Sequence, residues 1–197
     1  MEFFGFTLFD GLSGGGLLAV AAVIFVVGLA LTIKGGDWFV DSASWFAEDL
    51  VVDGVTELSK HDVGALIVFE RETKLGEIIS TGTIVNADPS KEIIGNIFFH
   101  NAPMHDGATI IRGGRIYASG CFLPLSQNYD ISNMLGTRHR AAIGMSEQSD
   151  AVVVIVSEET GIISIARAGK ITRYADTEAL KKVLAKYYWQ ELESSRR

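Results

Sequence analysis

The amino-acid sequence predicts an α/β (α+β) protein in which a mixed central β-sheet is flanked by helices and preceded by one N-terminal transmembrane helix. Three observations lead to this prediction. A long uncharged apolar run lies near the N-terminus, short apolar runs bounded by glycine-rich turns recur from Val63 onward, and helical patterns alternate with those runs. The 197 residues have room for one sizeable domain plus an appendage, and a hydrophobic content of 48% favours a packed core over disorder.

Charge and cysteine content restrict the function. The net charge of −7 has the wrong sign for a general nucleic-acid binder, so we expect no nucleic-acid partner, and a few local cations must hold any anionic ligand. Cys121 is the only cysteine, which leaves no disulfide framework and no thiolate metal cluster and fits a reducing compartment. We expect its thiol to be buried in the core rather than reactive.

The first apolar segment predicts a single membrane-spanning helix. No charged residue occurs over residues 11–33, and the core of this run, residues 17–33, approaches the roughly 20 apolar residues that span a bilayer. A cleaved signal peptide is the alternative, but the first ten residues carry two acidic and no basic side chains. Lys34 follows the run and favours a cytoplasmic location for what comes after it. We therefore expect residues 1–36 to anchor a cytoplasmic domain in the cell membrane by a single pass.

Residues 37–60 are predicted to form an amphipathic connecting helix. They follow the pair Gly35-Gly36, which breaks the preceding helix, and Trp38 and Trp45 are seven residues apart, a spacing that suits one helical face. This aromatic face suits either the membrane–water interface or packing on the globular domain, and the sequence leaves both alternatives open.

Residues 61–175 make up the predicted globular domain, and residues 176–197 a closing helix capped by Asp176. The first strand, Val63–Phe69, is a continuous apolar run, as expected for a strand that is buried on both faces. Further strands are expected at Ala108–Ile111, Arg115–Phe122, Ala151–Val156 and Gly161–Arg167, the last two paired as a hairpin, and helices at Lys91–Phe99, Thr137–Ser146 and about 177–193.

The segment Leu135–Ala142 reads as a turn followed by the start of a helix, with Thr137 at or near the N-cap. Unpaired backbone N–H groups gather at such an end. Arg138 and Arg140 lie there against the helix dipole, which favours anions, so a bound anion would remove the conflict. A phosphate held by the helix N-terminus, the two arginines and His139 fits this pattern. A solvated basic turn is the alternative.

A second polar segment, Asn101–Ala108, places His105 and Asp106 immediately before a predicted strand, with Pro103 ending the preceding helix. Polar groups at the end of a strand are well placed to line a cleft. Beside a phosphate site, a carboxylate orients a metal or accepts a proton from an attacking hydroxyl, and both roles recur in phosphoryl transfer. Taken alone, the Asp-Gly pair is an ordinary turn.

A third segment, Ser157–Gly161, follows an apolar strand and carries Glu158 and Glu159. Carboxylates in such a position hold hard cations such as Mg or Mn. The same residues also suit an ordinary exposed hairpin loop, and only the combination of the three segments favours a ligand site.

Together these segments closely resemble the catalytic domain of bacterial diadenylate cyclases. The resemblance covers about residues 55–175, and it includes the first apolar strand and several motifs in the family's order. These motifs are His105-Asp-Gly-Ala108, Gly120-Cys-Phe-Leu-Pro-Leu-Ser126, Leu135-Gly-Thr-Arg-His-Arg-Ala-Ala142 and Val156-Ser-Glu-Glu-Thr-Gly161.

The resemblance implies an enzyme that condenses two ATP molecules into cyclic di-AMP and two pyrophosphates. It implies a homodimer with face-to-face sites, each holding one ATP, in which each 3′-hydroxyl attacks the α-phosphorus of the other nucleotide. Asp106 would assist deprotonation of that hydroxyl, and Gly107 would leave room for the nucleotide to approach the backbone.

The other site residues implied by the resemblance divide into three groups. The triphosphate would be held by Arg138, His139 and Arg140 with Thr137 and Ser157, and Gly136 and Ala108 belong to the same nucleotide-binding motifs. Phe122 and Leu123 would contact adenine, with Phe122 stacking on its face. A divalent cation, Mg or Mn, would be bound by His105 and Glu159, with Glu158 as the alternative carboxylate.

The chain departs from the family's membrane-type members in two ways. Those members resemble it in the cyclase domain but precede that domain with about three transmembrane helices, whereas one span is predicted here. Tethering to the membrane should survive, while a regulatory protein partner that contacts the further helices is in doubt. Many relatives also have Tyr where this chain has Phe122.

Two other functions compete with an active cyclase. A catalytically inactive sensor of ATP or cyclic di-AMP would keep the same fold, and the intact Asp106 and Arg138–Arg140 motif argue against it. A membrane scaffold that recruits a partner through residues 37–53 would leave the cyclase motifs without a role.

Overall fold

The computed structural model describes residues 49–128, 136–174 and 177–189. The predicted transmembrane helix over residues 17–33, most of the predicted connecting helix and the proposed cap Asp176 lie outside these ranges. Among the residues that are described, no helix is both long and apolar enough to cross a membrane.

The described residues are built on one mixed, seven-stranded sheet in the order β2-β4-β3-β1-β5-β6-β7. Only β1 and β3 run parallel to each other, and every other neighbouring pair is antiparallel. The strands are β1 (Ala65–Phe69), β2 (Thr83–Ala87), β3 (Ala108–Arg112), β4 (Arg115–Cys121), β5 (Val152–Val156), β6 (Ile163–Arg167) and β7 (Lys170–Tyr174). The predicted mixed sheet is therefore confirmed.

The two central strands β1 and β5 are buried along their whole length, because helices cover both faces of the sheet. Their sequences, Ala-Leu-Ile-Val-Phe and Val-Val-Val-Ile-Val, lack the alternation of a half-exposed strand for this reason. The predictions of a doubly buried strand near Val63–Phe69 and of a hairpin formed by β5 and β6 are confirmed.

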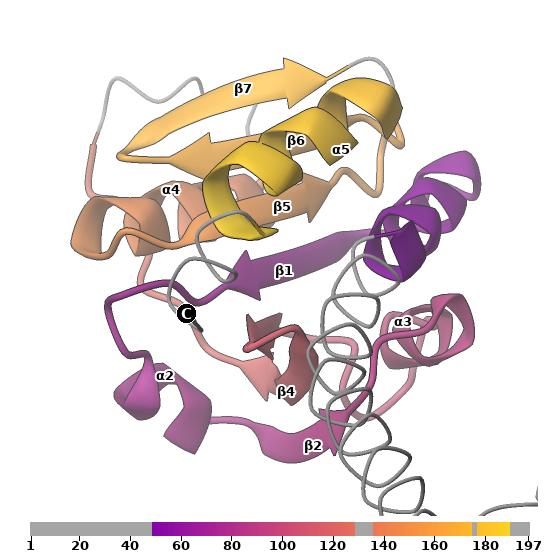
Figure 1. Ribbon diagram of the computed structural model, residues 1–197, viewed down its shortest axis with the longest axis horizontal. Coiled ribbons are helices and arrows are strands. Elements are labelled where there is room, and N and C mark those ends of the chain that lie inside the picture. The colour runs from indigo at the N-terminus through magenta and orange to yellow at the C-terminus, as the bar shows by residue number, and fades with distance from the viewer. Residues whose placement is uncertain (1–48, 129–135, 175–176, 190–197) are drawn as a thin grey trace, which may run out of the picture. The chain divides into compact units, whose positions relative to one another are not determined.

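Helices form a layer on each face of the sheet (Figure 1). One face is covered by the helical residues 49–60, α3 (Lys91–Ile97), α5 (Thr177–Leu184) and the π-helical turn η1 (Ala185–Trp189). The other face is covered by α2 (Gly76–Ser80) and α4 (Thr137–Gln148). In Figure 1, α5 lies in front of the sheet and α4 behind it. Each layer closes its own apolar core.

A buried ion pair ties β1 to β3 at one end of the sheet. Glu70 follows β1, and its carboxylate accepts two hydrogen bonds from the Arg112 guanidinium, at 2.8 and 2.7 Å, and a third from the Leu75 amide at 2.9 Å. The carboxylate is thus satisfied despite its burial, as a buried charge requires. The opposite end of these strands is left to form the cleft.

Three elements were not predicted from the sequence: α2, β2 and β7. The helix α2 has only five residues, and β2 is largely exposed at the edge of the sheet, so neither has a strong apolar pattern. The strand β7, Lys-Ile-Thr-Arg-Tyr, is mostly polar because it lies at the other edge.

Candidate active site

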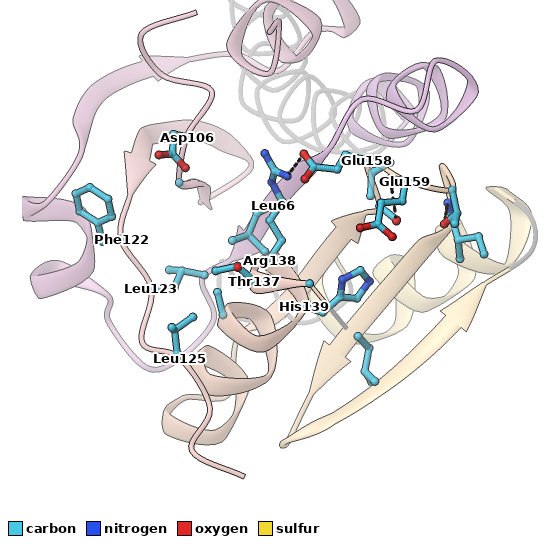
Figure 2. Close-up of a pocket in the computed structure, with 18 of the residues that line it drawn as sticks. Leu66, Asp106, Phe122, Leu123, Leu125, Thr137, Arg138, His139, Glu158 and Glu159 are labelled. Atoms are coloured by element: carbon cyan, nitrogen blue, oxygen red, sulfur yellow. Dashed lines mark hydrogen bonds and ion pairs between the residues drawn. The ribbon is translucent and has the colours of Figure 1, made fainter. Parts of the chain in front are cut away.

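A cleft of about 1090 Å³ opens at one end of the sheet, where β1 and β3 begin and β4 and β5 end. This volume is large enough for a nucleotide. Figure 2 shows its construction: Phe122, Leu123 and Leu125 follow one wall, Thr137, Arg138 and His139 come from the start of α4, and Glu158 and Glu159 come from the turn after β5.

The N-terminus of α4 points its first residues into this cleft. Gly136 is the N-cap, and α4 begins at Thr137, one residue earlier than expected if Thr137 were the cap. The first turn has no acidic residue and no side-chain cap. Within the described ranges, the backbone N–H groups of Thr137 and Arg138 have no acceptor. The first turn therefore combines free donors, the positive end of the helix dipole and a cationic side chain.

Arg138 lines the cleft and forms an ion pair with Glu158. Figure 2 marks this pair by a dashed line. The guanidinium rests on Gly64, because a Cβ atom at that position would lie 2.7 Å from Nη1 of Arg138 and 3.0 Å from its Cζ. Gly64 therefore provides the space that lets Arg138 reach Glu158.

His139 is half-buried in the same wall. Burial lowers the pKa of its imidazole below the ordinary value of 6.5, and the positive charge of Arg173 lowers this pKa further. The negative charge of Glu159 acts in the opposite direction and raises it, but the net pKa stays lowered. His139 is therefore neutral at neutral pH when no ligand is bound, and it acts as a hydrogen-bond donor or acceptor rather than as a cation.

Asp106 lies two residues before the start of β3, is exposed, and lines the cleft. In the described part of the chain its carboxylate has no hydrogen-bond or ion-pair partner. The next residue, Gly107, has a φ of +106°, and a Cβ atom there would lie 2.8 Å from the carbonyl carbon of Gly120. Glycine is thus required by the approach of β3 to β4, a reason different from the predicted approach of a nucleotide.

The loop after β4 forms an apolar wall. Phe122 is 66% exposed, an unusual situation for a large aromatic residue, and it lines the cleft with Leu123 and Leu125. The Phe122 amide donates a hydrogen bond of 2.9 Å to Oγ1 of Thr81, which fixes the backbone where the ring emerges. Cys121 also lines the cleft, but burial raises the pKa of its thiol to about 11, so it is not a thiolate nucleophile.

The turn Ser157–Gly161 forms the wall that faces this loop. The Ser157 hydroxyl accepts a hydrogen bond from the Glu159 amide at 3.3 Å. The turn is also attached to the helical residues 49–60, because the Ser59 hydroxyl donates to the Gly161 carbonyl at 2.6 Å. Glu158 and Glu159 both line the cleft.

Three of the predicted site residues do not line this cleft: His105, Ala108 and Arg140. His105 packs edge-on against His100 with ring centroids 5.9 Å apart, and its Nδ1 lies 2.6 Å from the Ala102 carbonyl. Ala108 is buried in the core beneath the cleft. Among the described residues, no group of three or more His, Cys, Asp or Glu side chains is arranged to hold a metal ion.

Arg173 is a cleft residue that reasoning from the sequence missed. It lies in β7, lines the cleft, and acts electrostatically on His139. The turn residues Ala168 and Gly169, both with positive φ, were the signal that a further hairpin strand follows β6. The contributions of Gly64, Leu66 and Leu125 were also missed, since small and apolar residues carry no chemical signature.

Comparison with known proteins gives a consistent set of similarities. The family model described as DisA bacterial checkpoint controller nucleotide-binding matches residues 52–171. The cyclic di-AMP synthase CdaA of Bacillus subtilis (strain 168) is 44% identical over 145 residues, which are 74% of this chain and 53% of that protein. The diadenylate cyclase of Listeria monocytogenes serotype 1/2a (strain 10403S) is 45% identical over 129 residues, 66% of this chain and 47% of that protein. The chain spans about half the length of these curated relatives.

The fold also matches a solved structure. The crystal structure of a double mutant of DacA from Staphylococcus aureus has a TM-score of 0.70 and 46% sequence identity to this chain. The similarity covers 72% of this chain and 95% of that one, so it includes the mixed sheet and its flanking helices.

Proposed function

This chain belongs to the diadenylate cyclase family, and we propose that it condenses two ATP molecules into cyclic di-AMP with release of two pyrophosphates. One observation carries the proposal. The carboxylate of Asp106, which has no partner among the described residues, faces the same cleft as the cationic first turn of α4. The proposed proton acceptor and the proposed phosphate site thus line one cleft that is large enough for a nucleotide.

The reaction needs a proton acceptor and a stabilised leaving group. The 3′-hydroxyl oxygen of one ATP forms a bond to the α-phosphorus of the other, and the bond from that phosphorus to the oxygen bridging to the β-phosphate breaks. Pyrophosphate leaves with the electron pair, and Asp106 accepts the hydroxyl proton. The same step with the two nucleotides exchanged closes the ring.

The start of α4 is proposed to hold the triphosphate. Thr137, Arg138, His139 and Ser157 all line the cleft, and the N–H groups of Thr137 and Arg138 have no acceptor among the described residues. Negative charge grows on the pyrophosphate as it leaves, so these groups lower the barrier only if they stay in place during the reaction. The hydrogen bonds of the turn after β5 favour such rigidity.

The apolar loop is proposed to hold adenine. Phe122 offers an exposed ring face for stacking, and Leu123 offers an aliphatic surface beside it. Phe122 has no hydroxyl, so the stacking contact contributes area but no side-chain hydrogen bond.

The proposed reaction requires two chains, because one cleft per chain holds one ATP. We propose a homodimer in which two copies face each other by two-fold symmetry, so that each cleft presents its nucleotide to the other. The openings of the clefts would then face each other. Molecular mass in solution with and without nucleotide tests this arrangement.

A divalent cation, Mg or Mn, is part of the proposal. The oxygen donors Asp106 and Glu159 face the cleft, and hard cations prefer oxygen. Glu158 is engaged by Arg138, which favours Glu159 as the carboxylate ligand, and His105 remains a candidate next to Asp106. The cation would neutralise phosphate charge when bound, and substrate oxygens and water would complete its shell.

Residues 17–33 are proposed to anchor the domain by a single pass through the cell membrane, with the catalytic domain in the cytoplasm, where ATP is available. The support is the uncharged apolar run itself. Deleting residues 1–36 should release the protein from membranes and leave catalysis intact, since no proposed site residue lies there. A regulatory protein partner is compatible with this arrangement.

The decisive experiment incubates the purified full chain with ATP and either Mg or Mn and quantifies cyclic di-AMP and pyrophosphate by mass spectrometry. Asp106→Asn should abolish synthesis while ATP binding is largely kept. Undiminished turnover by this variant would remove Asp106 from the mechanism. A folded dimer that binds ATP but makes no product with either metal would indicate a nucleotide sensor with the same fold.

A further inference from the structure

The loop proposed to hold adenine, called the adenine wall below, and the proposed phosphate site come from different segments of the chain. The distance between them has to match the distance between the adenine and the phosphates of ATP. The wall is the loop of residues 122–128, and Phe122, Leu123 and Leu125 from it line the cleft. The phosphate site is the start of α4. If the proposed function holds, whatever joins this loop to this helix sets the fit of the whole nucleotide.

Ser126 is the point at which the loop is attached to α4. Its amide donates to the Arg140 carbonyl at 3.1 Å, and its own carbonyl accepts a hydrogen bond from Nη2 of Arg140 at 3.2 Å. Its hydroxyl donates to Oε1 of Glu147 at 2.8 Å and accepts from the Asn128 amide at 3.2 Å. Ser126 is only 1% exposed, so water does not replace these bonds easily.

The helix also makes room for the loop. A Cβ atom at Gly144 would lie 2.6 Å from the Ser126 amide nitrogen and 2.7 Å from the Leu125 carbonyl carbon, and it would also contact the Pro124 carbonyl. Gly144 therefore allows the loop backbone to pass directly over α4.

Arg140 belongs to this attachment and not to the phosphate wall. Two residues along an α-helix correspond to a rotation of roughly 200°, so Arg138 and Arg140 lie on nearly opposite sides of α4. Arg138 and His139 line the cleft, whereas the Arg140 guanidinium is bonded to the loop backbone. An anion bound in the cleft therefore lies on the Arg138 side of α4, away from the Arg140 guanidinium.

We propose that Arg140 is a positioning residue that, with Ser126 and Glu147, holds the adenine wall at a fixed distance from the phosphate site. It does not bind phosphate. Its contribution to the reaction is made through the loop that it holds.

The test measures the binding of adenosine, inorganic tripolyphosphate and ATP to the full chain by titration calorimetry. Arg140→Ala should weaken adenosine and ATP about tenfold, as expected when one hydrogen bond to a charged group is lost, and leave tripolyphosphate unchanged. Ser126→Ala should give the same pattern, because it weakens the same attachment from the loop side. Arg138→Ala should do the reverse and weaken tripolyphosphate and ATP but not adenosine.

A drop in tripolyphosphate affinity in Arg140→Ala equal to that in Arg138→Ala would overturn the proposal. Amide hydrogen exchange without nucleotide gives an independent reading: Arg140→Ala should accelerate exchange at Ser126 and Asn128 and leave β5 unchanged, and unaltered exchange at both amides would also overturn it. If the wild-type chain makes no cyclic di-AMP, the proposed function fails, while the exchange measurement still decides the role of Arg140.

Discussion

Arg138 and Glu158 form an ion pair that joins the first turn of α4 to the turn between β5 and β6. The guanidinium predicted to bind phosphate is therefore engaged by a carboxylate of the same chain. A carboxylate and a phosphate present similar oxygen pairs to arginine. Binding of a triphosphate at Arg138 thus exchanges one anion for another.

Replacing Glu158 should change metal-free binding. Glu158→Gln removes the competing carboxylate, so ATP should bind more tightly in the absence of divalent cations. Glu158 is 63% exposed and its pairing is screened by water, so the gain should be modest, about two- to fivefold. Titration calorimetry with ATP in the presence of a chelator measures this gain in affinity. Glu159→Gln is the matched control, and an equal gain in that variant would mean that general charge, not the ion pair, is responsible.

A methyl group at Gly64 should disturb Arg138. In Gly64→Ala the new Cβ atom would meet Nη1 of Arg138 at 2.7 Å, and since a guanidinium at the end of a flexible side chain moves easily, we expect it to be displaced rather than the fold to be lost. ATP affinity should fall about tenfold, as for a lost charge-assisted contact, and the melting temperature should change little. Gly76→Ala is the control, because nothing lies within 4 Å of a Cβ atom there. Unchanged ATP affinity in Gly64→Ala would show that the resting position of Arg138 is unimportant.

Arg173 is expected to contribute to triphosphate binding from β7. Arg173→Ala should lower ATP affinity about tenfold through the loss of one charge-assisted contact and should also raise the pKa of His139, since the positive charge that lowers it is gone. Titration calorimetry gives the first quantity and NMR titration of the imidazole the second. Lys170→Ala is the control, because it removes a positive charge from the start of the same strand at a residue that does not line the cleft. It should change neither the ATP affinity nor the pKa of His139.

ATP binding should depend on pH through His139. The pKa of this imidazole is lowered in the free protein, and a bound triphosphate favours the protonated form, so binding takes up a proton. ATP affinity should therefore rise as the pH falls from about 7.5 to 6, an effect that follows from linkage. Calorimetry in buffers of different ionisation enthalpy measures the proton uptake. The His139→Gln variant separates the proton uptake by His139 from the titration of ATP itself. Proton uptake as large in this variant as in the wild type would contradict the assignment to His139.

The same pKa shift affects stability in the opposite direction. The folded protein binds fewer protons at His139 than the unfolded chain does, so the stability contributed by the neutral ring is present above pH 6.5 and is lost as the pH falls through the lowered folded-state pKa. In the absence of nucleotide, wild-type protein should lose more stability than His139→Gln on acidification below pH 6.5. Denaturant titrations at several pH values compare the two, and parallel losses would exclude this contribution.

The centre of the fold was predictable because burial on both faces leaves a clear trace in the sequence. The strands β1 and β5 are unbroken apolar runs, and the hairpin of β5 and β6 follows from its turn. The edge strands β2 and β7 are less buried than the central strands and carry polar residues such as Asn86 and Arg173, so their sequences resemble loops. The edge strands of the sheet were therefore harder to predict than its central strands.

The grouping of the candidate site residues was predictable where it depends on charged motifs. Asp106, Arg138, His139 and Glu159 share one cleft, as the motifs indicate. The different contacts of Arg138 and Arg140 depend on which side of α4 each faces, and the pairing of Glu158 depends on the space above Gly64. These are properties of packing between segments that are far apart in the chain, and no local pattern encodes them.

The edge position of β7 also has a consequence for synthesis of the protein. The cleft takes its first lining residue from position 66 and its last from position 173, so most of the domain must be translated before every wall exists. A ribosome-bound chain that has not yet released β7 lacks Arg173, although β1, β3, β4 and β5 are already made. The complete cleft is therefore a late product of translation, and a nascent chain stalled before β7 should not hold ATP as the finished protein does.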